Sequence, residues 1–117
     1  MTEYIVLLPG DESVWANASA EQQAEMFERH RKFTELLEAR GHQVTGGNEL
    51  QPSSAAKTVT GSLDNVSVTD GPYAESAEQL GGYYTVITDN LDDLLKVCGV
   101  LADGGASVEV RPTVDHS

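Results

Sequence analysis

The chain has a single cysteine, Cys98, so no disulfide can join two parts of it. Small secreted domains are usually dense in disulfides, and their absence is typical of a reducing compartment. The N-terminus also lacks the basic residues of a secretory signal. An acidic Glu3 stands there instead, and the apolar run that follows ends at Pro9-Gly10. We therefore expect a cytoplasmic protein.

Long apolar runs are missing too, since no stretch approaches the roughly 20 apolar residues that cross a bilayer. Basic residues are scarce: seven Lys and Arg stand against 19 Asp and Glu, for a formal net charge of −12. A field of this sign repels phosphate backbones and anionic lipid surfaces. We expect no nucleic-acid partner and no membrane partner. The acidity itself is explained by solubility or by a salty host cytoplasm.

Patterns that hold metals or cofactors are also absent. The three histidines, His30, His42 and His116, have no short ligand spacing, there is no cysteine pair, and the carboxylates are spread out. No glycine-rich phosphate loop and no nucleophile elbow occur. The sequence therefore predicts no metal site and no cofactor.

The 117 residues, 39% of them hydrophobic, are enough for one domain with one core. Several runs are rich in β-branched and aromatic residues, and the extended run that contains Gly46-Gly47 suits a β-bulge. A hairpin is expected where two short runs flank Gly61-Ser62-Leu63-Asp64. The expected β-segments are 4–8, 42–50, 56–60, 65–70, 81–88 and 107–111, the last stopped by Pro112.

Two helices are expected. Ser19 and Gln22 have capping-box spacing, so a helix should begin near Ala20, run to about Arg40 and stop at Gly41. Asn90 can cap a second helix over 91–101, which Gly104-Gly105 would close. One stripe of the first helix should face the sheet. It consists of Met26, His30, Phe33 and Leu37.

The order of strand, long helix, several strands, helix and strand predicts an α+β domain. Its simplest topology is a ferredoxin-like split βαβ arrangement with an inserted hairpin. Two helices cover only one face of such a sheet. The other face would need a partner if it is apolar, and a second copy of the chain is the economical one. We therefore expect a homodimer.

The segment Asp70-Gly71-Pro72-Tyr73-Ala74-Glu75, followed by Glu78-Gln79-Leu80-Gly81-Gly82-Tyr83-Tyr84, resembles the signature of the DGPF group of the YCII-related family. Support comes from the first strand, from Gly46-Gly47 through Pro52, and from 107–112. The resemblance implies a ferredoxin-like fold assembled as a dimeric α/β barrel and leaves the activity open. Two positions depart from the family pattern. Tyr73 stands where Phe is usual, and Ala77 stands where a Lys is usual, which removes a cation that an anionic ligand would meet.

His30 and Asp70 are the candidate catalytic residues. More distant YCII-type relatives have a His at the place of His30, and the resemblance implies a His–Asp pair in which His30 serves as general acid or base. A histidine on an apolar stripe is more often a packed, hydrogen-bonded residue. Asp70 has a structural interpretation as well, because an Asp before Gly-Pro defines a turn. Both interpretations of each residue stay open.

Tyr73, Glu75 and Arg111 are candidate ligand-binding residues. The alternative for Glu75 and Arg111 is a solvated or paired charge. Tyr83 and Tyr84 should point to opposite faces of their strand, and core packing is their default role. Cys98 should be a small buried hydrophobe, since nothing basic nearby would lower its pKa.

Two function hypotheses follow. The first is a dimeric domain that binds a small molecule between the first helix, the sheet and the Asp70 loop, with isomerase- or lyase-like proton transfer by His30 and Asp70. Whether it is an enzyme is left open by this hypothesis. The second is a non-enzymatic partner module of an extracytoplasmic-function sigma factor, which the resemblance implies and which the charge of −12 would suit. A structural dimer without a ligand is a third alternative.

Overall fold

The computed structural model of the chain describes residues 1–103 and 105–117. A four-stranded sheet has the order β2-β5-β1-β6, and β3 and β4 form a separate two-stranded sheet. Every neighbouring pair is antiparallel. The elements in chain order are β1 (Thr2–Gly10), α1 (Glu12–Ala16), α2 (Ala20–Ala39), β2 (Gln43–Glu49), the 3-10 turn η1 (Ser53–Ala55), β3 (Lys57–Ser62), β4 (Asn65–Asp70), β5 (Gln79–Thr88), α3 (Leu91–Ala102) and β6 (Glu109–Pro112).

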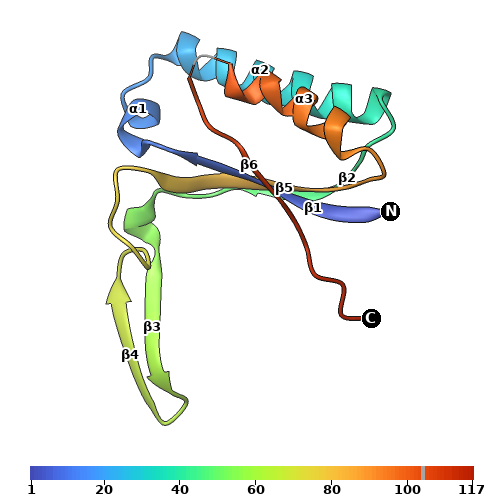
Figure 1. The fold of residues 1–117 in the computed structure, drawn as a ribbon. Coiled ribbons are helices and arrows are strands. Elements are labelled where there is room, and N and C mark those ends of the chain that lie inside the picture. Colours follow the sequence, from blue (N-terminus) through green and yellow to red (C-terminus); the bar gives the residue numbers. More distant parts are fainter. Residues whose placement is uncertain (104) are drawn as a thin grey trace.

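This order makes two split βαβ units. In the first, α2 connects β1 to the parallel β2, and β5 lies between those strands; in the second, α3 connects β5 to β6 around β1. Both helices lie on one face of the sheet, as Figure 1 shows. The predicted α+β class is confirmed, and the architecture is consistent with a ferredoxin-like fold. The β3–β4 hairpin is the insertion, between β2 and β5.

Helix α2 begins at the predicted capping box. The Ser19 hydroxyl accepts a hydrogen bond from the Gln22 backbone N–H, and the Gln22 side chain accepts one from the Ser19 N–H. Phe33 and Leu37 are completely buried, as the stripe predicts. Met26 was expected to face the sheet and is exposed instead, because this end of α2 lies over α1, where Phe27 stacks edge-on against Trp15.

The core lies between the sheet and the two helices. Alternation along β1 and β5 directs Val6 and Val86 to the helices, and Tyr84 packs on the same side. Cys98 is buried, as expected, and burial raises its pKa to about 11. The buried apolar cluster consists of Val6, Phe33, Leu37, Val86, Leu94, Val97, Cys98 and Leu101.

Several boundaries differ from the expected ones. The five-residue helix α1 occupies a segment that was expected to be loop, because Asp11 caps it by accepting a hydrogen bond from Ser13 N–H at 2.9 Å. The bulge in β2 falls between Val44 and Gly46, close to the predicted glycines. Strand β6 includes Pro112, which was expected to stop it. The helix stop assigned to Gly104 lies outside the described residues, whereas Asn90 caps α3 as expected.

The predicted hairpin is confirmed, with β3 and β4 joined by Leu63 and Asp64. It projects from the body as an arm on the side of the sheet away from the helices (Figure 1). The radius of gyration, 16.4 Å, reflects this shape, because a compact domain of this length would have about 13 Å. We refer to residues 57–70 as the arm.

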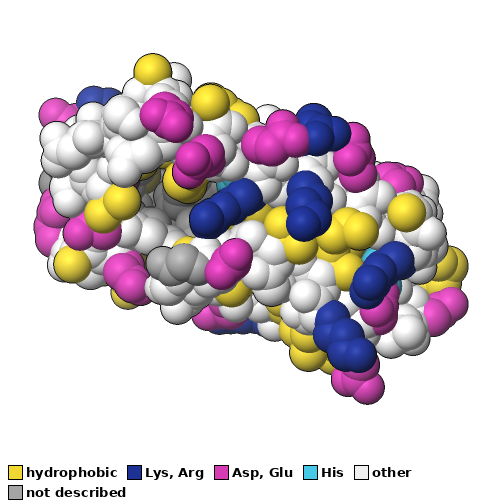
Figure 2. All heavy atoms as spheres, turned by 90° about the horizontal axis from the view of Figure 1, so that it is seen from above, with side chains coloured by type: hydrophobic (Ala, Val, Ile, Leu, Met, Phe, Trp, Pro, Cys, Tyr) yellow, Lys and Arg dark blue, Asp and Glu magenta, His cyan; other side chains and the backbone are white. Residues whose placement is uncertain are grey.

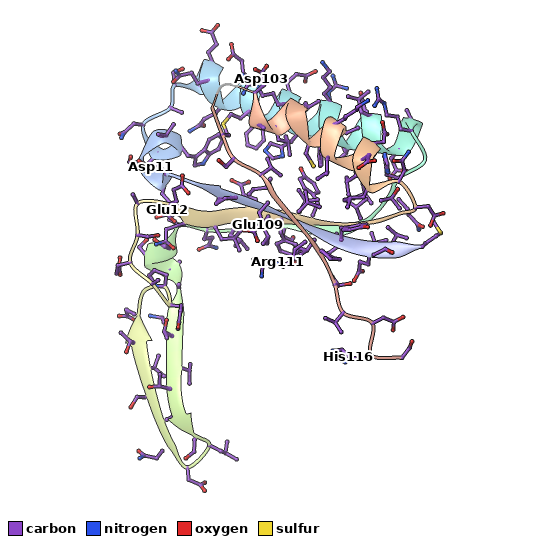
Figure 3. The ribbon with its side chains drawn as sticks, in the orientation of Figure 1. Asp11, Glu12, Asp103, Glu109, Arg111 and His116 are labelled. Carbon is purple, nitrogen blue, oxygen red and sulfur yellow. The ribbon has the colours of Figure 1, made fainter. Side chains whose placement is uncertain are left out.

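The sheet face away from the helices carries half-exposed apolar side chains. Ile5 and Leu7 lie opposite Thr85 and Tyr83 in neighbouring strands. Arg111 on β6 lies beside Ile5 on this face (Figure 3) and pairs with Glu109 at 2.5 Å. We call it the open face. Within the described residues, no helix is long and apolar enough to span a membrane.

Candidate functional site

The candidate site is centred on His30, which lies on α2 and points towards β5. Its Nδ1 is 2.7 Å from the hydroxyl oxygen of Tyr84, and the two rings lie 5.9 Å apart. The Tyr84 ring also packs on Phe33 at 5.2 Å. The sequence therefore predicts correctly that one of the paired tyrosines faces the helices, but it gives no sign that this tyrosine bonds to His30.

The electrostatic setting keeps His30 neutral at neutral pH. Burial lowers the pKa of His30 below its ordinary value of 6.5, and the charge of Glu49 opposes this by a smaller amount. Burial raises the pKa of Tyr84, so its hydroxyl stays protonated. Among the described residues, no group bonds to Nε2 of His30. A neutral imidazole with one nitrogen held by Tyr84 thus has its other nitrogen available to a ligand.

Two glycines shape the sheet beneath His30. A Cβ on Gly47 of β2 would lie 2.6 Å from the carbonyl oxygen of Tyr83 and 3.0 Å from the Tyr84 ring. Gly82 of β5 pairs with Glu49, and a Cβ there would meet the Asn48 carbonyl oxygen at 3.1 Å. A side chain at Gly47 would collide with the backbone of β5, and one at Gly82 would crowd the backbone of β2; such close backbone approach is a usual reason for glycine inside a strand.

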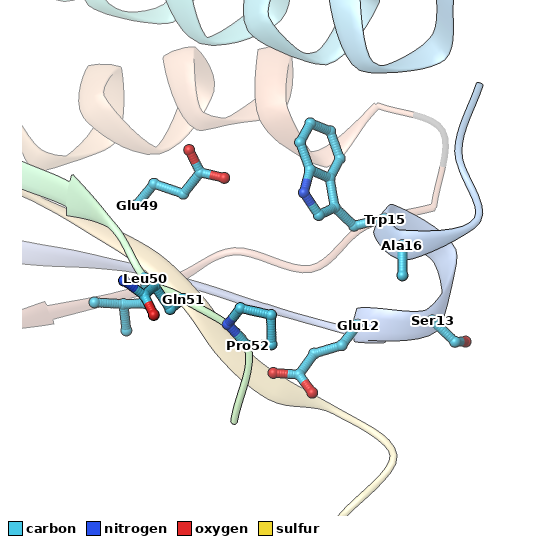
Figure 4. Close-up of a pocket in the computed structure, with 8 residues that line it drawn as sticks. All are labelled: Glu12, Ser13, Trp15, Ala16, Glu49, Leu50, Gln51 and Pro52. Carbon is cyan, nitrogen blue, oxygen red and sulfur yellow. The ribbon is translucent and has the colours of Figure 1, made fainter. Parts of the chain in front are cut away.

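A pocket of about 370 Å³ opens beside Glu49; Glu49 lines it, whereas His30 and Tyr84 do not. In Figure 4, the Glu49 carboxylate and the Trp15 indole both point from their elements into the space between sheet and helices. Glu12 lines the pocket and connects α1 to η1, because its carboxylate accepts hydrogen bonds from the backbone N–H and hydroxyl of Ser53. The remaining lining residues are Ser13, Ala16, Leu50, Gln51 and Pro52. Its volume suits a small ligand.

Asp70 is not brought to His30 within one chain. It lies at the base of the arm, where its carboxylate pairs with the Lys57 ammonium across the β3–β4 ladder. The Asp70 side chain is 80% exposed. The turn at Gly71 is held by other groups: its N–H donates to the Ala56 carbonyl, and its carbonyl accepts from the Thr58 hydroxyl.

The three predicted ligand-binding residues lie outside this pocket. Tyr73 is 96% exposed, and Glu75 is exposed in the same loop after the arm. Arg111 lies on the open face, paired with Glu109. Neither the loop nor β6 brings them to His30, so within one chain the structure does not gather these three residues into a site.

A second histidine cluster has a different character. His42 is 2% exposed; its Nδ1 lies 2.7 Å from the Thr88 hydroxyl and its Nε2 lies 2.8 Å from the Asp93 carboxylate. The other oxygen of Asp93 accepts from Arg40 at 2.8 Å. The His42 hydrogen bond lowers the pKa of Asp93. Because both ring nitrogens are occupied, His42 has none left for a ligand, and the cluster holds the start of α3 against the end of α2.

The charge on the helix side is mixed rather than uniformly acidic. Figure 2 shows Lys and Arg side chains gathered over the helices among acidic ones. Those on the helices or their caps are Arg29, Arg31, Lys32, Arg40 and Lys96. In the part of the chain that the structure describes, no three His, Cys, Asp or Glu side chains gather as metal ligands would.

The comparison with known proteins gives a family. The model of the YCII-related domain matches residues 2–113. The chain is also 34% identical over 117 residues to R00369, an uncharacterized protein of Rhizobium meliloti (strain 1021), and the alignment covers 93% of this chain and 90% of that one. Both similarities extend over nearly the whole length, including the elements that carry His30 and Tyr84. The chain belongs to the YCII-related domain family.

Proposed function

We propose that this chain is a homodimeric small-molecule-binding domain in which His30 transfers a proton to and from a small organic acid, as an isomerase or lyase would. One observation carries the proposal. His30 is a half-buried, neutral histidine with Nδ1 on the Tyr84 hydroxyl, and it lies close enough to a pocket-lining carboxylate, Glu49, to feel its charge. In His42, by contrast, both ring nitrogens are hydrogen-bonded within the chain.

The proposed chemistry follows from the hydrogen bond between His30 and Tyr84 and from the nearby charge of Glu49. In the tautomer whose Nδ1–H donates to the Tyr84 hydroxyl oxygen, the Nε2 lone pair is free to accept a proton from the ligand. His30 then accepts a proton from a carbon next to a carbonyl and returns it at another position. The Glu49 charge stabilises the imidazolium that forms. Glu49 thus has the role that was expected of Asp70, the acidic partner of His30.

Self-association is the second part of the proposal. The open face carries Ile5, Leu7, Tyr83 and Ile87, which are partly exposed in one chain. A contiguous apolar surface on a sheet is usually covered in the working protein. A second copy related by a two-fold axis would cover it with the same face, because such an interface is self-complementary. This supports the dimeric barrel that the DGPF resemblance implies.

Proton transfer is tested without knowing the full reaction. The protein is incubated in D₂O with a panel of small oxo acids, such as pyruvate, acetoacetate and oxaloacetate, and loss of the carbon-bound protons beside the carbonyl is followed by NMR. We expect exchange above the protein-free rate for at least one acid. His30→Gln should reduce it by about a hundredfold or more, the usual contribution of a general base.

The matched control is His116→Gln, which changes an exposed histidine near the C-terminus. It should leave the exchange rate unchanged. Equal exchange by wild type and folded His30→Gln protein would contradict the role of His30. No exchange and no change in Trp15 fluorescence with any acid of the panel would contradict a site for organic acids; Trp15 is the chain's single tryptophan and lines the pocket.

A further inference from the structure

The arm is amphipathic, and none of the described residues of its own chain covers its apolar side. Val59 and Val68 lie directly opposite each other in the β3–β4 ladder, and Val66 follows on the same side because successive strand residues alternate. These three valines are 62%, 59% and 49% exposed, and Leu63 at the tip is 94% exposed. The other side of the arm is polar and presents Thr58, Thr60, Ser67 and Thr69.

Such a hairpin needs a surface to lie on. An isolated two-stranded hairpin is marginally stable at best in water, and an apolar face or a packing partner is what stabilises it. Here the apolar face is present, and the described part of the same chain does not pack on it, because the arm projects away from the body (Figure 1). The base is fixed by the Lys57–Asp70 pair and the Thr58–Gly71 hydrogen bond, so the arm leaves the sheet in a defined direction.

The direction and the length of the arm indicate which surface covers its apolar side. The arm extends on the side of the open face, which is the space that a second copy stacked on that face would occupy (Figure 1). Six residues per strand at about 3.3 Å each give an arm of about 20 Å, whereas two sheets that pack face to face lie about 10 Å apart. The arm is therefore long enough to pass the partner's sheet and to reach the level of its helices.

The charge distribution also favours a second copy of this chain as the partner of the arm. Two copies with a net charge of −12 each repel one another, so a contact between them belongs where charges are fewest. Between Thr58 and Thr69 the sequence has one charged residue, Asp64 in the turn. On the open face, the Arg111 guanidinium and Glu109 carboxylate pair with each other. The arm and the open face are thus surfaces on which two acidic copies can meet.

We infer that the arm is a clasp: the valine side of each arm lies against a second copy of this chain, and the partner's arm does the same in return. A two-fold axis closes this exchange after two copies, so it forms a dimer and no fibre. The inference rests on the self-association proposed above and adds to it a second contact, made by residues outside the sheet.

The test compares neighbouring positions on the two sides of one strand. Val68→Asp places a charge on the apolar side, and Ser67→Asp places the same charge on the polar side. Both variants therefore add one Asp to β4. A third variant, Ile5→Asp, disrupts the open face. Each protein is studied by sedimentation equilibrium over a wide range of concentration, with circular dichroism to show that it is folded.

We expect wild type and Ser67→Asp to be dimers with dissociation constants within about twofold of each other. Val68→Asp should weaken the dimer by about tenfold or more, because a charge buried at an interface is costly. If Ile5→Asp dissociates and folded Val68→Asp matches Ser67→Asp, the clasp is overturned while the dimer through the open face stands. A monomeric wild type would overturn both and leave the exchange assay of His30 as a separate question.

If Val68→Asp does not fold, Val68→Thr takes its place, because it keeps the β-branched shape and exchanges a methyl group for a hydroxyl. A weaker dimer than that of Ser67→Thr is then the expected result. Equal dissociation constants for this pair would overturn the clasp.

Discussion

The Nδ1 atom of His30 lies 2.7 Å from the hydroxyl oxygen of Tyr84, and this contact joins α2 to β5 on the helix side of the sheet. It fixes the ring of a half-buried histidine and leaves its Nε2 without a partner among the described residues. It also distinguishes His30 from His42, in which both nitrogens are bonded.

Replacing Tyr84 by Phe removes the hydroxyl and keeps the ring that packs on Phe33. The hydroxyl oxygen accepts from Nδ1–H, and this bond is stronger to the charged ring than to the neutral one, so its loss should lower the pKa of His30, measured by NMR titration of the ring C–H signals. The free energy of unfolding should fall by about 0.5–1.5 kcal/mol, as for one hydrogen bond. Tyr83→Phe, on the other side of the same strand, is the control and should leave the His30 titration unchanged. A higher His30 pKa in Tyr84→Phe would contradict the acceptor role of the hydroxyl.

Replacing Glu49 by Gln removes a negative charge that raises the pKa of His30. The same NMR titration should therefore show a lower His30 pKa in Glu49→Gln, and the difference should shrink at high salt. Glu38→Gln is the control, because Glu38 lies two turns along α2 from His30 and is exposed. If the two variants shift the His30 pKa equally, the effect comes from net charge and Glu49 has no special place beside His30.

The pH dependence of stability should depend on His30. Its pKa is lower in the folded chain than the ordinary 6.5, so the unfolded chain binds more protons below that pH. Acidification through and below pH 6.5 should therefore destabilise the fold, and stability should be regained as the pH rises. Urea titrations at several pH values should show that His30→Gln flattens this part of the profile. An unchanged slope in the variant would contradict the assignment.

His42 should matter to stability and not to ligand binding. His42→Ala removes the hydrogen bonds to Thr88 and Asp93 and leaves a cavity, so the free energy of unfolding should fall by about 2–4 kcal/mol in chemical denaturation. His116→Ala, an exposed position, should cost almost nothing. A loss of proton exchange activity in a well-folded His42→Ala protein would show that the second cluster belongs to the site.

Cys98 should be inert in the folded protein. Its pKa of about 11 leaves about one thiol in ten thousand ionised at pH 7, and the side chain is buried in the core. Reaction with a disulfide reagent should be slower by about two orders of magnitude or more than in denaturant, where both obstacles are removed. Rapid labelling of the native protein would mean that α3 opens frequently.

Much of the fold is predictable from local patterns. The capping box at Ser19, the cap at Asn90 and the opposite faces of Tyr83 and Tyr84 depend on neighbours in sequence, and all three are as expected. The hairpin is also predictable, because its turn lies between two β-prone runs. Helix α1 is missed because a five-residue helix has too few residues for a periodic pattern, although Asp11 gives a cap signal.

The site is less predictable because it depends on contacts distant in sequence. His30 can be singled out as a polar residue on an apolar stripe, but its partner Tyr84 is 54 residues away and is indistinguishable from Tyr83 by composition. The resemblance to the DGPF group directs attention to Asp70, whose nearest partner in one chain is Lys57. The alternative of a sigma-factor partner module stays a prediction that depends on net charge and resemblance.

If His30 is the neutral base of a ligand site, an NMR titration of the histidine ring signals of the wild-type protein should reveal it. We expect His30 to titrate below pH 6.5, and we expect an organic acid that binds to shift the Nε2 resonance of His30 while those of His42 and His116 stay in place. A His30 that is already charged at pH 7, or an Nε2 signal unaffected by every acid that quenches Trp15, would contradict it.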